Sequence, residues 1–463
     1  MTDDRDASQA EQDSVVVSEA SAAEHMRSGL PPGPRYPKLL TVYLTAYRTK
    51  AFLDTAYKRY GHVFTVRLIY GKTLVFVADP ALVEDVFTAE LGVLTADKGA
   101  APILGVHSIV GLDGDEHRAA RQLLQPAFHG DRIQRYHDLM ERVCAQEVAS
   151  WPVGQPFELL PRFEAITQKV VSSALFGTGG GPTVEMLATR FEELMAFRSK
   201  PLGALFLLLM PPGGNLPKPF LRVRGAYDDE VYKAIEAARH DPRLDDRDDI
   251  LAMLLQARHD DGSPLTDQEI RDHVTTLLIM GHVSTATTLA WVFERLVRHP
   301  EALERLRAEA QTANEDYLDA VLTETLRVRP TVPIIVREVS KPYRVREYEV
   351  PPGNLIACNV YGLHVREDLY PEPQRFRPER FLGHKPAPYT WIPFGGGDHH
   401  CIGSSFAMME MKLVIRMLMQ QFRFRTTERS GEKAKRKAIN FMPADGARVV
   451  IDERVAAAVS VGV

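Results

Sequence analysis

The stretch FGGGDHHCIG, residues 394–403, is the most informative part of the sequence. Three glycines precede the cysteine, and the apolar-periodic segment 404–421 after it predicts a helix that begins just behind Cys401. Glycines let the backbone approach a flat ligand, and amide N–H groups at a helix start favour the thiolate, the form of cysteine that binds metal. The pattern indicates that Cys401 is a thiolate ligand of a metal. A buried thiol beside a glycine turn would have the same sequence.

Zinc does not fit this cysteine. His399, His400 and Cys401 are adjacent in sequence, and neighbouring residues do not readily share one tetrahedral ion without a second spaced pair of ligands, which is lacking. The other two cysteines, Cys144 and Cys358, lie far away in the sequence. An odd number of widely spaced cysteines fits a reducing compartment better than a disulfide framework.

Composition predicts an ordinary soluble globular protein. The chain has 463 residues, of which 45% are apolar and 25% are charged, and its 56 basic and 61 acidic side chains leave a net charge of −5. This mildly acidic balance excludes nucleic acid as the main partner, because phosphate neutralisation supplies that affinity. Residues 1–28 are polar and acidic and lack the basic stretch and apolar core of a secretory signal.

Two apolar stretches require a comparison with membrane segments. Residues 274–293 carry no formal charge and are long enough to cross a bilayer, but their many threonine, serine and glycine residues favour a helix buried in a protein core. Residues 202–210 are too short to span a bilayer. They are interpreted as a covered loop or helix end, with an apolar lid in weak contact with a membrane surface as the alternative.

Periodicity predicts a mainly α protein with small β-sheets, an α+β fold. A helix is expected over 51–60 and a hairpin over 63–77, helices dominate 116–260, and short strands return at 334–339, 343–350, 422–426 and 448–452. Thr266 and Glu269 form a capping box, and Pro300 ends the helix that follows. That central helix, 267–298, would be about 48 Å long.

The middle of the central helix has two interpretations. At Gly281-His282-Val283-Ser284-Thr285 the small and hydroxyl side chains can bond back to the preceding turn and open the helix, which would make room for a ligand. Close packing of Gly281 and Ala286 against a neighbouring helix is the alternative, and it does not account for the hydroxyl groups. The segment alone does not decide between them.

The pattern Phe394-x-x-Gly397-x-His399-x-Cys401-x-Gly403 resembles the haem-binding loop of the cytochrome P-450 haem-thiolate monooxygenases, soluble bacterial type. Two further motifs of that family match, Glu-x-x-Arg at 324–327 and FRPERF at 376–381. The resemblance implies the cytochrome P-450 fold with a long central helix over haem b (iron protoporphyrin IX). It also implies a single catalytic domain over 31–455, followed by a short tail at 456–463. The polar, acidic composition before this domain predicts a disordered arm at 1–30.

The resemblance assigns roles to individual residues. Cys401 would be the axial ligand of the haem iron, and Phe394, Gly397 and Gly403 would bind the cofactor. Four residues match the family's contacts to the haem propionates: His117, Arg121, Arg337 and His399. Three residues match a buried charged trio with a structural role: Glu324, Arg327 and Arg380. Walls of the substrate pocket are expected at 95–112, 202–210, 280–284 and 332–335.

The implied activity is insertion of one oxygen atom from O2 into an apolar small-molecule substrate. Electrons would come from a separate ferredoxin and ferredoxin reductase or a similar donor, and the enzyme would be cytoplasmic. A basic run at Lys433, Lys435, Arg436 and Lys437 is either a docking site for an acidic partner or a solvated hairpin tip.

This chain departs from the family's proton relay. Val283 stands where the family has an acid, and Ser284 stands at its first threonine, so Ser284 and Thr285 are the remaining candidates for a catalytic hydroxyl. The missing acid favours a first alternative, an enzyme that uses peroxide or that rearranges or dehydrates an already oxygenated substrate. A second alternative is a non-catalytic haem-thiolate binding or sensor protein.

Overall fold

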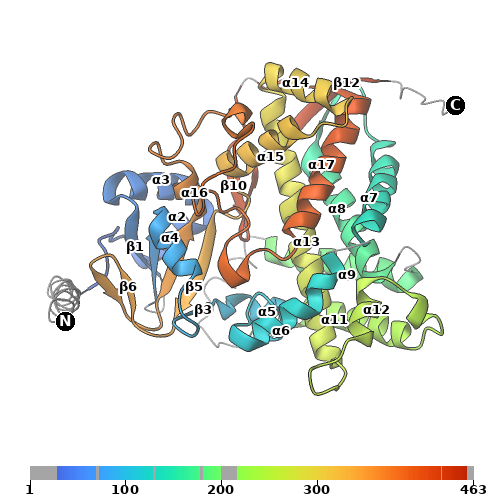
Figure 1. Cartoon of the computed structure of the whole chain (residues 1–463), viewed down its shortest axis with the longest axis horizontal. Helices are drawn as coiled ribbons and strands as arrows, with labels where there is room; N and C mark the ends of the chain where they lie inside the picture. The colour runs from blue at the N-terminus through green and yellow to red at the C-terminus, as the bar shows by residue number, and fades with distance from the viewer. Residues whose placement is uncertain are drawn as a thin grey trace, which may run out of the picture.

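The computed structural model describes residues 29–68, 72–128, 132–177, 181–199, 216–428 and 430–455. A β-rich part made of early and late segments lies beside a larger helical part (Figure 1). The expected apolar lid at 202–210, the arm before residue 29 and the tail after residue 455 lie outside the described residues.

The helices and strands have the following bounds. The α-helices are α2 (Lys38–Tyr47), α3 (Thr49–Tyr60), α4 (Pro80–Phe87), α5 (Ala101–Leu104), α6 (Gly114–Leu124), α7 (Arg132–Val148), α8 (Leu159–Phe176), α9 (Gly181–Ser199), α11 (Lys218–Arg239), α12 (Ile250–Gln256), α13 (Asp267–Leu296), α14 (Pro300–Ala310), α15 (Asp316–Val328), α16 (Val360–His364) and α17 (Ser404–Gln421). The 3-10 helices are η2 (Lys98–Ala100), η3 (Gln125–Phe128), η4 (Leu244–Asp246), η5 (Pro378–Phe381) and η6 (Gly397–His399). The strands are β1 (Val63–Arg67), β2 (Thr73–Val77), β3 (Leu94–Ala96), β4 (Pro156–Glu158), β5 (Ile334–Val339), β6 (Tyr343–Val345), β7 (Tyr348–Val350), β8 (Leu355–Asn359), β9 (Phe422–Arg425), β10 (Ala434–Lys437), β11 (Asn440–Pro443) and β12 (Arg448–Arg454).

The main sheet joins strands from both ends of the chain. Its order is β1-β2-β8-β5-β3, and β8 runs parallel to β2 and antiparallel to β5. Every residue of β8 is buried, so this strand lies between two apolar clusters, one on each side of the sheet. The pairing of β5 with β3 places Arg337 opposite Ala96, which brings residues far apart in sequence to one edge of the sheet.

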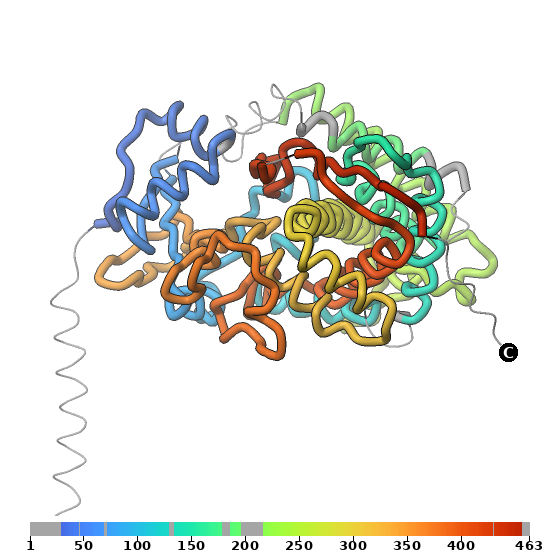
Figure 2. Tube along the Cα trace, turned by 90° about the horizontal axis from the view of Figure 1, so that it is seen from above, coloured from blue at the N-terminus to red at the C-terminus, as the bar shows by residue number. Residues whose placement is uncertain are grey.

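Helix α13 is the central element of the helical part. Thr266 and Glu269 form the expected capping box at its start, and α8 packs along it. In Figure 2 α13 is seen nearly end-on, with other helices around it. It is long and apolar enough to cross a membrane, but 78% of its most apolar window is buried inside the protein, which supports the interpretation as a core helix.

Of the two interpretations of the middle of α13, the structure does not show the opened helix. The helix runs without interruption from Asp267 to Leu296, and a Cβ atom at Gly281 would lie 3.0 Å from Val171 of α8. Close helix packing, the alternative interpretation, therefore explains this glycine. The hydroxyls of Ser284 and Thr287 do bond back to the carbonyls of Met280 and Val283, but they do so within a continuous helix.

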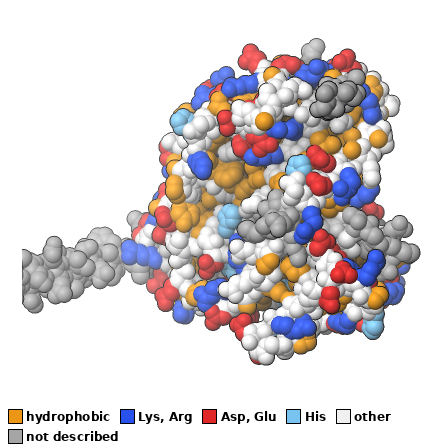
Figure 3. Space-filling view, turned by 45° about the vertical axis from the view of Figure 1, so that its right-hand side comes forward, with side chains coloured by type: hydrophobic (Ala, Val, Ile, Leu, Met, Phe, Trp, Pro, Cys, Tyr) orange, Lys and Arg blue, Asp and Glu red, His pale blue; other side chains and the backbone are white. Residues whose placement is uncertain are grey.

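Surface charge is mixed. In the face shown in Figure 3, acidic and basic side chains are interspersed, and apolar side chains gather near the middle. This face carries no extended region of a single charge sign.

A buried carboxyl group lies in α17 without a partner. Glu410 is completely buried, and among the described residues neither of its oxygens has a hydrogen-bond partner. Burial raises its pKa well above the ordinary carboxyl value. The side chain is therefore protonated in the folded protein at pH values where it would be ionised in the unfolded chain.

Replacing Glu410 should change how stability depends on pH. Below the ordinary carboxyl pKa both states are protonated and the group has no effect. Above it the unfolded state loses the proton first, so the free energy of unfolding falls by about 1.4 kcal/mol per pH unit until the raised pKa is reached. Urea unfolding of wild type between about pH 5 and 8 should show this slope, and Glu410→Gln should lose it. The exposed control Glu428→Gln should keep the wild-type slope, and equal slopes in all three proteins would contradict the assignment.

Candidate active site

The loop that carries Cys401 is closed by its own backbone. The N–H of Cys401 donates to the carbonyl of Phe394 at 2.9 Å, and that of His400 donates to Gly397 at 3.0 Å. Helix α17 begins directly afterwards, at Ser404. The sulfur therefore lies at the start of a helix, where amide N–H groups and the helix dipole favour negative charge.

The electrostatic surroundings of Cys401 are divided. The surrounding protein raises the pKa of its thiol, although the side chain is exposed, while the Gly403 N–H bonded to the sulfur and the Arg121 guanidinium lower it. A bound metal cation would add the positive charge that a thiolate needs at this position. The donor set therefore fits a metal-bound sulfur.

The glycines before the cysteine have a packing role. Gly395 and Gly397 have φ values of +73° and +61°, in the left-handed region that favours glycine. A Cβ atom at Gly396 would lie 2.6 Å from the ring of Phe87, and one at Gly397 would lie 2.1 Å from the Phe87 carbonyl oxygen. These glycines let the loop pack against the end of α4, whereas a Cβ at Gly403 would meet no protein atom within 4 Å.

The residues matched to propionate contacts meet around one carboxylate. Asp113, which the sequence did not single out, lies 3.4 Å from Nε2 of His399 and accepts the Ala96 N–H at 2.9 Å. Arg337 pairs with Ala96 across the sheet, and the rings of His117 and His399 lie 4.0 Å apart. The predicted residues therefore come together, and Asp113 organises them.

The arginine on α6 supports the cysteine loop directly. Nη1 of Arg121 donates to the carbonyls of His400 at 2.7 Å and Asp398 at 3.3 Å. Arg121 and His117 lie one turn apart on α6, so the same helix faces the loop with a cation and a ring.

Protonation differs among these groups. Burial, reinforced by nearby His399 and Arg121, lowers the pKa of His117 to about 4, so this ring is neutral at neutral pH. Burial alone would raise the pKa of Asp113, but hydrogen bonds from His399 and the Ala96 N–H lower it on balance. The site thus combines an ionised carboxylate with two arginines and a neutral histidine. An anionic ligand edge would complete its charge balance.

The predicted charged trio forms a buried support behind the loop. Arg327 donates two hydrogen bonds to Glu324, at 2.7 and 2.9 Å, and Arg380 donates a third at 3.1 Å. Arg327 also donates to the carbonyl of His364 at 2.7 Å, and Nε2 of His364 accepts the N–H of Ile392 at 3.0 Å. Burial and Arg327 lower the pKa of His364 to about 3, so its ring is neutral and can accept this bond.

The trio yields a stability prediction. Glu324→Gln leaves two buried guanidinium groups without their countercharge, which should lower the free energy of unfolding by about 3 to 5 kcal/mol. The matched control is Glu315→Gln, which weakens half-buried pairs with Lys412 and Arg416 near the surface and should cost at most about 1 kcal/mol. Urea unfolding measures both values. Equal costs for the two variants would show that the trio is not a structural support.

A second polar network fastens the segment before α6 to α13. Asp272 accepts the N–H of His107 at 3.0 Å, and Arg271 donates to the carbonyl of Leu104 at 3.2 Å. A Cβ at Gly105 would lie 1.9 Å from the Asp272 carboxylate, so only glycine fits there. This network holds part of the expected pocket wall, residues 95–112, against the central helix.

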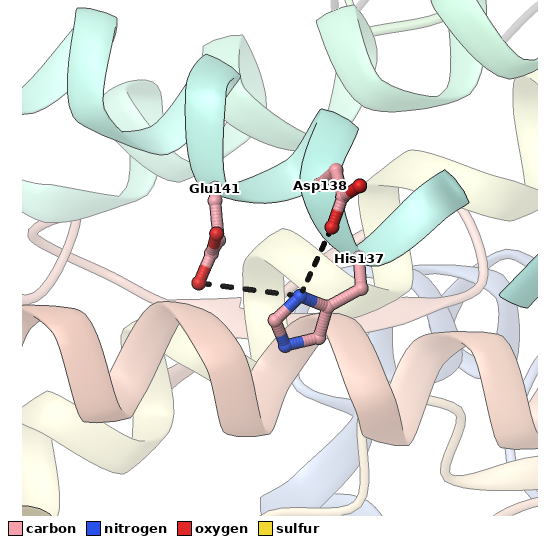
Figure 4. A group of neighbouring side chains, drawn as sticks. All are labelled: His137, Asp138 and Glu141. Carbon is pink, nitrogen blue, oxygen red and sulfur yellow. Dashed lines mark ion pairs between the residues drawn. The ribbon is translucent and has the colours of Figure 1, made fainter. Parts of the chain in front are cut away.

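A cluster on α7 has the residue types of a metal site but not its setting. Nδ1 of His137 lies 3.9 Å from Asp138 and 4.0 Å from Glu141. Figure 4 shows both carboxylates beside the imidazole ring. The two carboxylates are exposed, and acidic groups on one exposed helix turn are ordinarily solvated. We assign no ion to this cluster.

Comparison with known proteins identifies the family. The model of the family Cytochrome P450 matches residues 31–447. The chain belongs to the cytochrome P450 family. Cytochrome P450 138 of Mycobacterium tuberculosis is 38% identical over 453 residues, which cover 95% of this chain and all of the relative. Cytochrome P450 135B1 of the same organism is 36% identical, covering 91% of each chain.

Solved structures agree with this assignment. The retinoic acid bound cyanobacterial CYP120A1 superimposes with a TM-score of 0.79 at 27% identity, covering 92% of this chain and all of that one. The predicted P450 fold, enzyme class and haem cofactor are therefore confirmed. The protein is a haem-thiolate monooxygenase, and its family binds iron protoporphyrin IX through a cysteine thiolate.

Proposed function

We propose that Cys401 supplies the thiolate to the haem iron. The observation that carries this proposal is that, of the three cysteines, Cys401 alone is exposed and receives a backbone N–H at a helix start. Burial raises the pKa of Cys144 and of Cys358 to about 12, so both stay protonated thiols. The haem would supply oxygen activation, and the chain would orient it and exclude water.

The cluster around Asp113 would hold the acidic edge of the haem. Arg121 and Arg337 would donate hydrogen bonds to the propionates, and His117 and His399 would complete the contact. Phe394 and Gly403 would lie against the porphyrin on the cysteine side. We also take residues 31–455 to be one catalytic domain, because the family model covers residues 31–447 of it.

An apolar small molecule is the proposed substrate. It would be oxidised by one oxygen atom from O2, with electrons from a separate ferredoxin and its reductase. Partly buried Met280 and Val283 on α13 supply apolar surface on the expected pocket side of the helix. The binding of retinoic acid, an apolar acid, by the cyanobacterial relative supports a substrate of this class.

The cysteine assignment is tested by the absorption of the carbon monoxide complex. Cys401→Ser should abolish the red-shifted ferrous-carbonyl band that thiolate ligation produces. The matched control Cys144→Ala removes a buried thiol and should retain the band. Retention of the band in Cys401→Ser with normal haem content would remove Cys401 from the iron.

Peroxide use, or reaction of an already oxygenated substrate, is a second candidate function. It is favoured by Val283, because no carboxylate is present at this turn of α13. The hydroxyl of Ser284 donates to the carbonyl of Met280 at 3.2 Å, and the hydroxyl of Thr285 donates to the carbonyl of Gly281 at 3.4 Å. Both hydroxyls remain candidates for hydrogen bonding to a bound ligand, without an acid behind them.

Restoring the acid distinguishes these functions. If the enzyme uses O2, Val283→Asp should raise the fraction of consumed electrons that appears in product, because a carboxyl would supply protons to the site. The isosteric control Val283→Thr should have little effect. Coupling is measured as product formed per NADPH consumed, with haem content checked. Unchanged coupling in Val283→Asp, with efficient turnover of wild type by peroxide, would favour the second candidate.

A further inference from the structure

Helix α2 presents apolar side chains to the outside of the protein. Leu39 is 72% exposed and Tyr47 is 52% exposed, although the same helix buries Val42 on its inner side. The exposed set on α2 is Leu39, Leu40, Tyr43 and Tyr47, and Tyr36 is exposed just before the helix begins. Residues 40, 43 and 47 follow helical spacing along one side. A contiguous apolar strip of this kind ordinarily marks an interaction surface.

The strip is bordered by positive charge. Arg35, Lys38 and Arg48 are exposed, and residues 31–53 contain no Asp or Glu, although the whole chain carries a net charge of −5. Among the residues that the structure describes, none of these three side chains has an ion-pair partner. Their charges are therefore available to an anionic surface.

A second element extends the positive charge. The β10–β11 hairpin contacts α2, and Nη1 of Arg436 donates to the carbonyl of Thr45 at 2.7 Å. The hairpin is the basic run found in the sequence, and its remaining lysines are exposed, as is Ile439 at its turn. We call α2 with this hairpin the α2 face. Helices α2 and α3 form the upper left edge of the molecule in Figure 2.

We propose that the α2 face binds reversibly to the surface of an anionic lipid bilayer. Leucine and tyrosine side chains suit the boundary between acyl chains and headgroups, and arginine and lysine attract anionic headgroups. A helix of 10 residues is too short to span a bilayer, so α2 would lie in the plane of the interface.

A bilayer fits this face better than an acidic protein does. Four of the apolar side chains lie on α2 and Tyr36 lies just before it, and the face offers positive charge with no interspersed carboxylate on α2. An electron donor needs few contacts and relies on charge, and it gains little from five exposed apolar side chains. The binding does not depend on the proposed haem chemistry, although an apolar substrate would be concentrated in the same bilayer.

Co-sedimentation of the full-length haem-loaded protein with lipid vesicles tests the proposal. Wild type should bind vesicles of phosphatidylcholine with phosphatidylglycerol about tenfold more strongly than phosphatidylcholine alone. Raising the salt from about 0.05 to 0.5 M should remove that preference. The double variant Leu39→Ser with Tyr43→Ser should lose most binding to both vesicles. Arg35→Gln with Lys38→Gln and Arg48→Gln should lose only the preference for anionic lipid.

Matched controls locate the effect. Leu91→Ser and Leu221→Ser make the same kind of change at apolar side chains exposed outside the α2 face, and both should bind like wild type. Cys401→Ser should also bind like wild type, so a failed haem assignment and a failed membrane assignment are distinguishable. Equal binding to both vesicles, or wild-type binding by the Leu39/Tyr43 variant, would overturn the proposal.

Discussion

The position of the Cys401 sulfur depends on a hydrogen-bonded path that begins at a buried charge. Glu324 is fully buried and is compensated by Arg327 and Arg380. Arg327 also donates a hydrogen bond to the carbonyl of His364, and the His364 ring accepts the N–H of Ile392, at the start of the cysteine loop. The loop then closes on itself through Cys401 and Phe394. The hydrogen bonds of this path lie inside the protein, and they hold the loop that keeps an exposed thiol at the start of α17.

The opposite side of the site is organised by a carboxylate instead. Asp113 joins β3, α6 and the cysteine loop through Ala96 and His399, and Arg121 fastens the loop from the same helix. The residues proposed to contact the haem propionates thus come from three distant segments, α6, β5 and the cysteine loop. A neutral His117 beside Arg121 and Arg337 leaves excess positive charge, which suits the acidic edge of a porphyrin.

Local sequence patterns predicted many of the helices and strands, and family motifs predicted the site residues. The capping box at Thr266 and the proline after the helix defined α13, and the apolar period after Cys401 defined α17. Features that depend on distant partners were not predictable. The role of Gly281 depends on Val171, and those of Gly396 and Gly397 depend on Phe87. Strand β8 is buried on both faces, so it lacks alternation, and Asp113 and His364 are lone residues whose partners only the fold brings near.

X-ray absorption at the iron K edge of the haem-loaded wild-type protein tests the central claim most directly, because it counts the atoms bound to iron without a substitution that disturbs the loop. The account predicts one sulfur scatterer in the first shell of the ferric protein, in addition to the porphyrin nitrogens. A first shell of nitrogen and oxygen alone would contradict it.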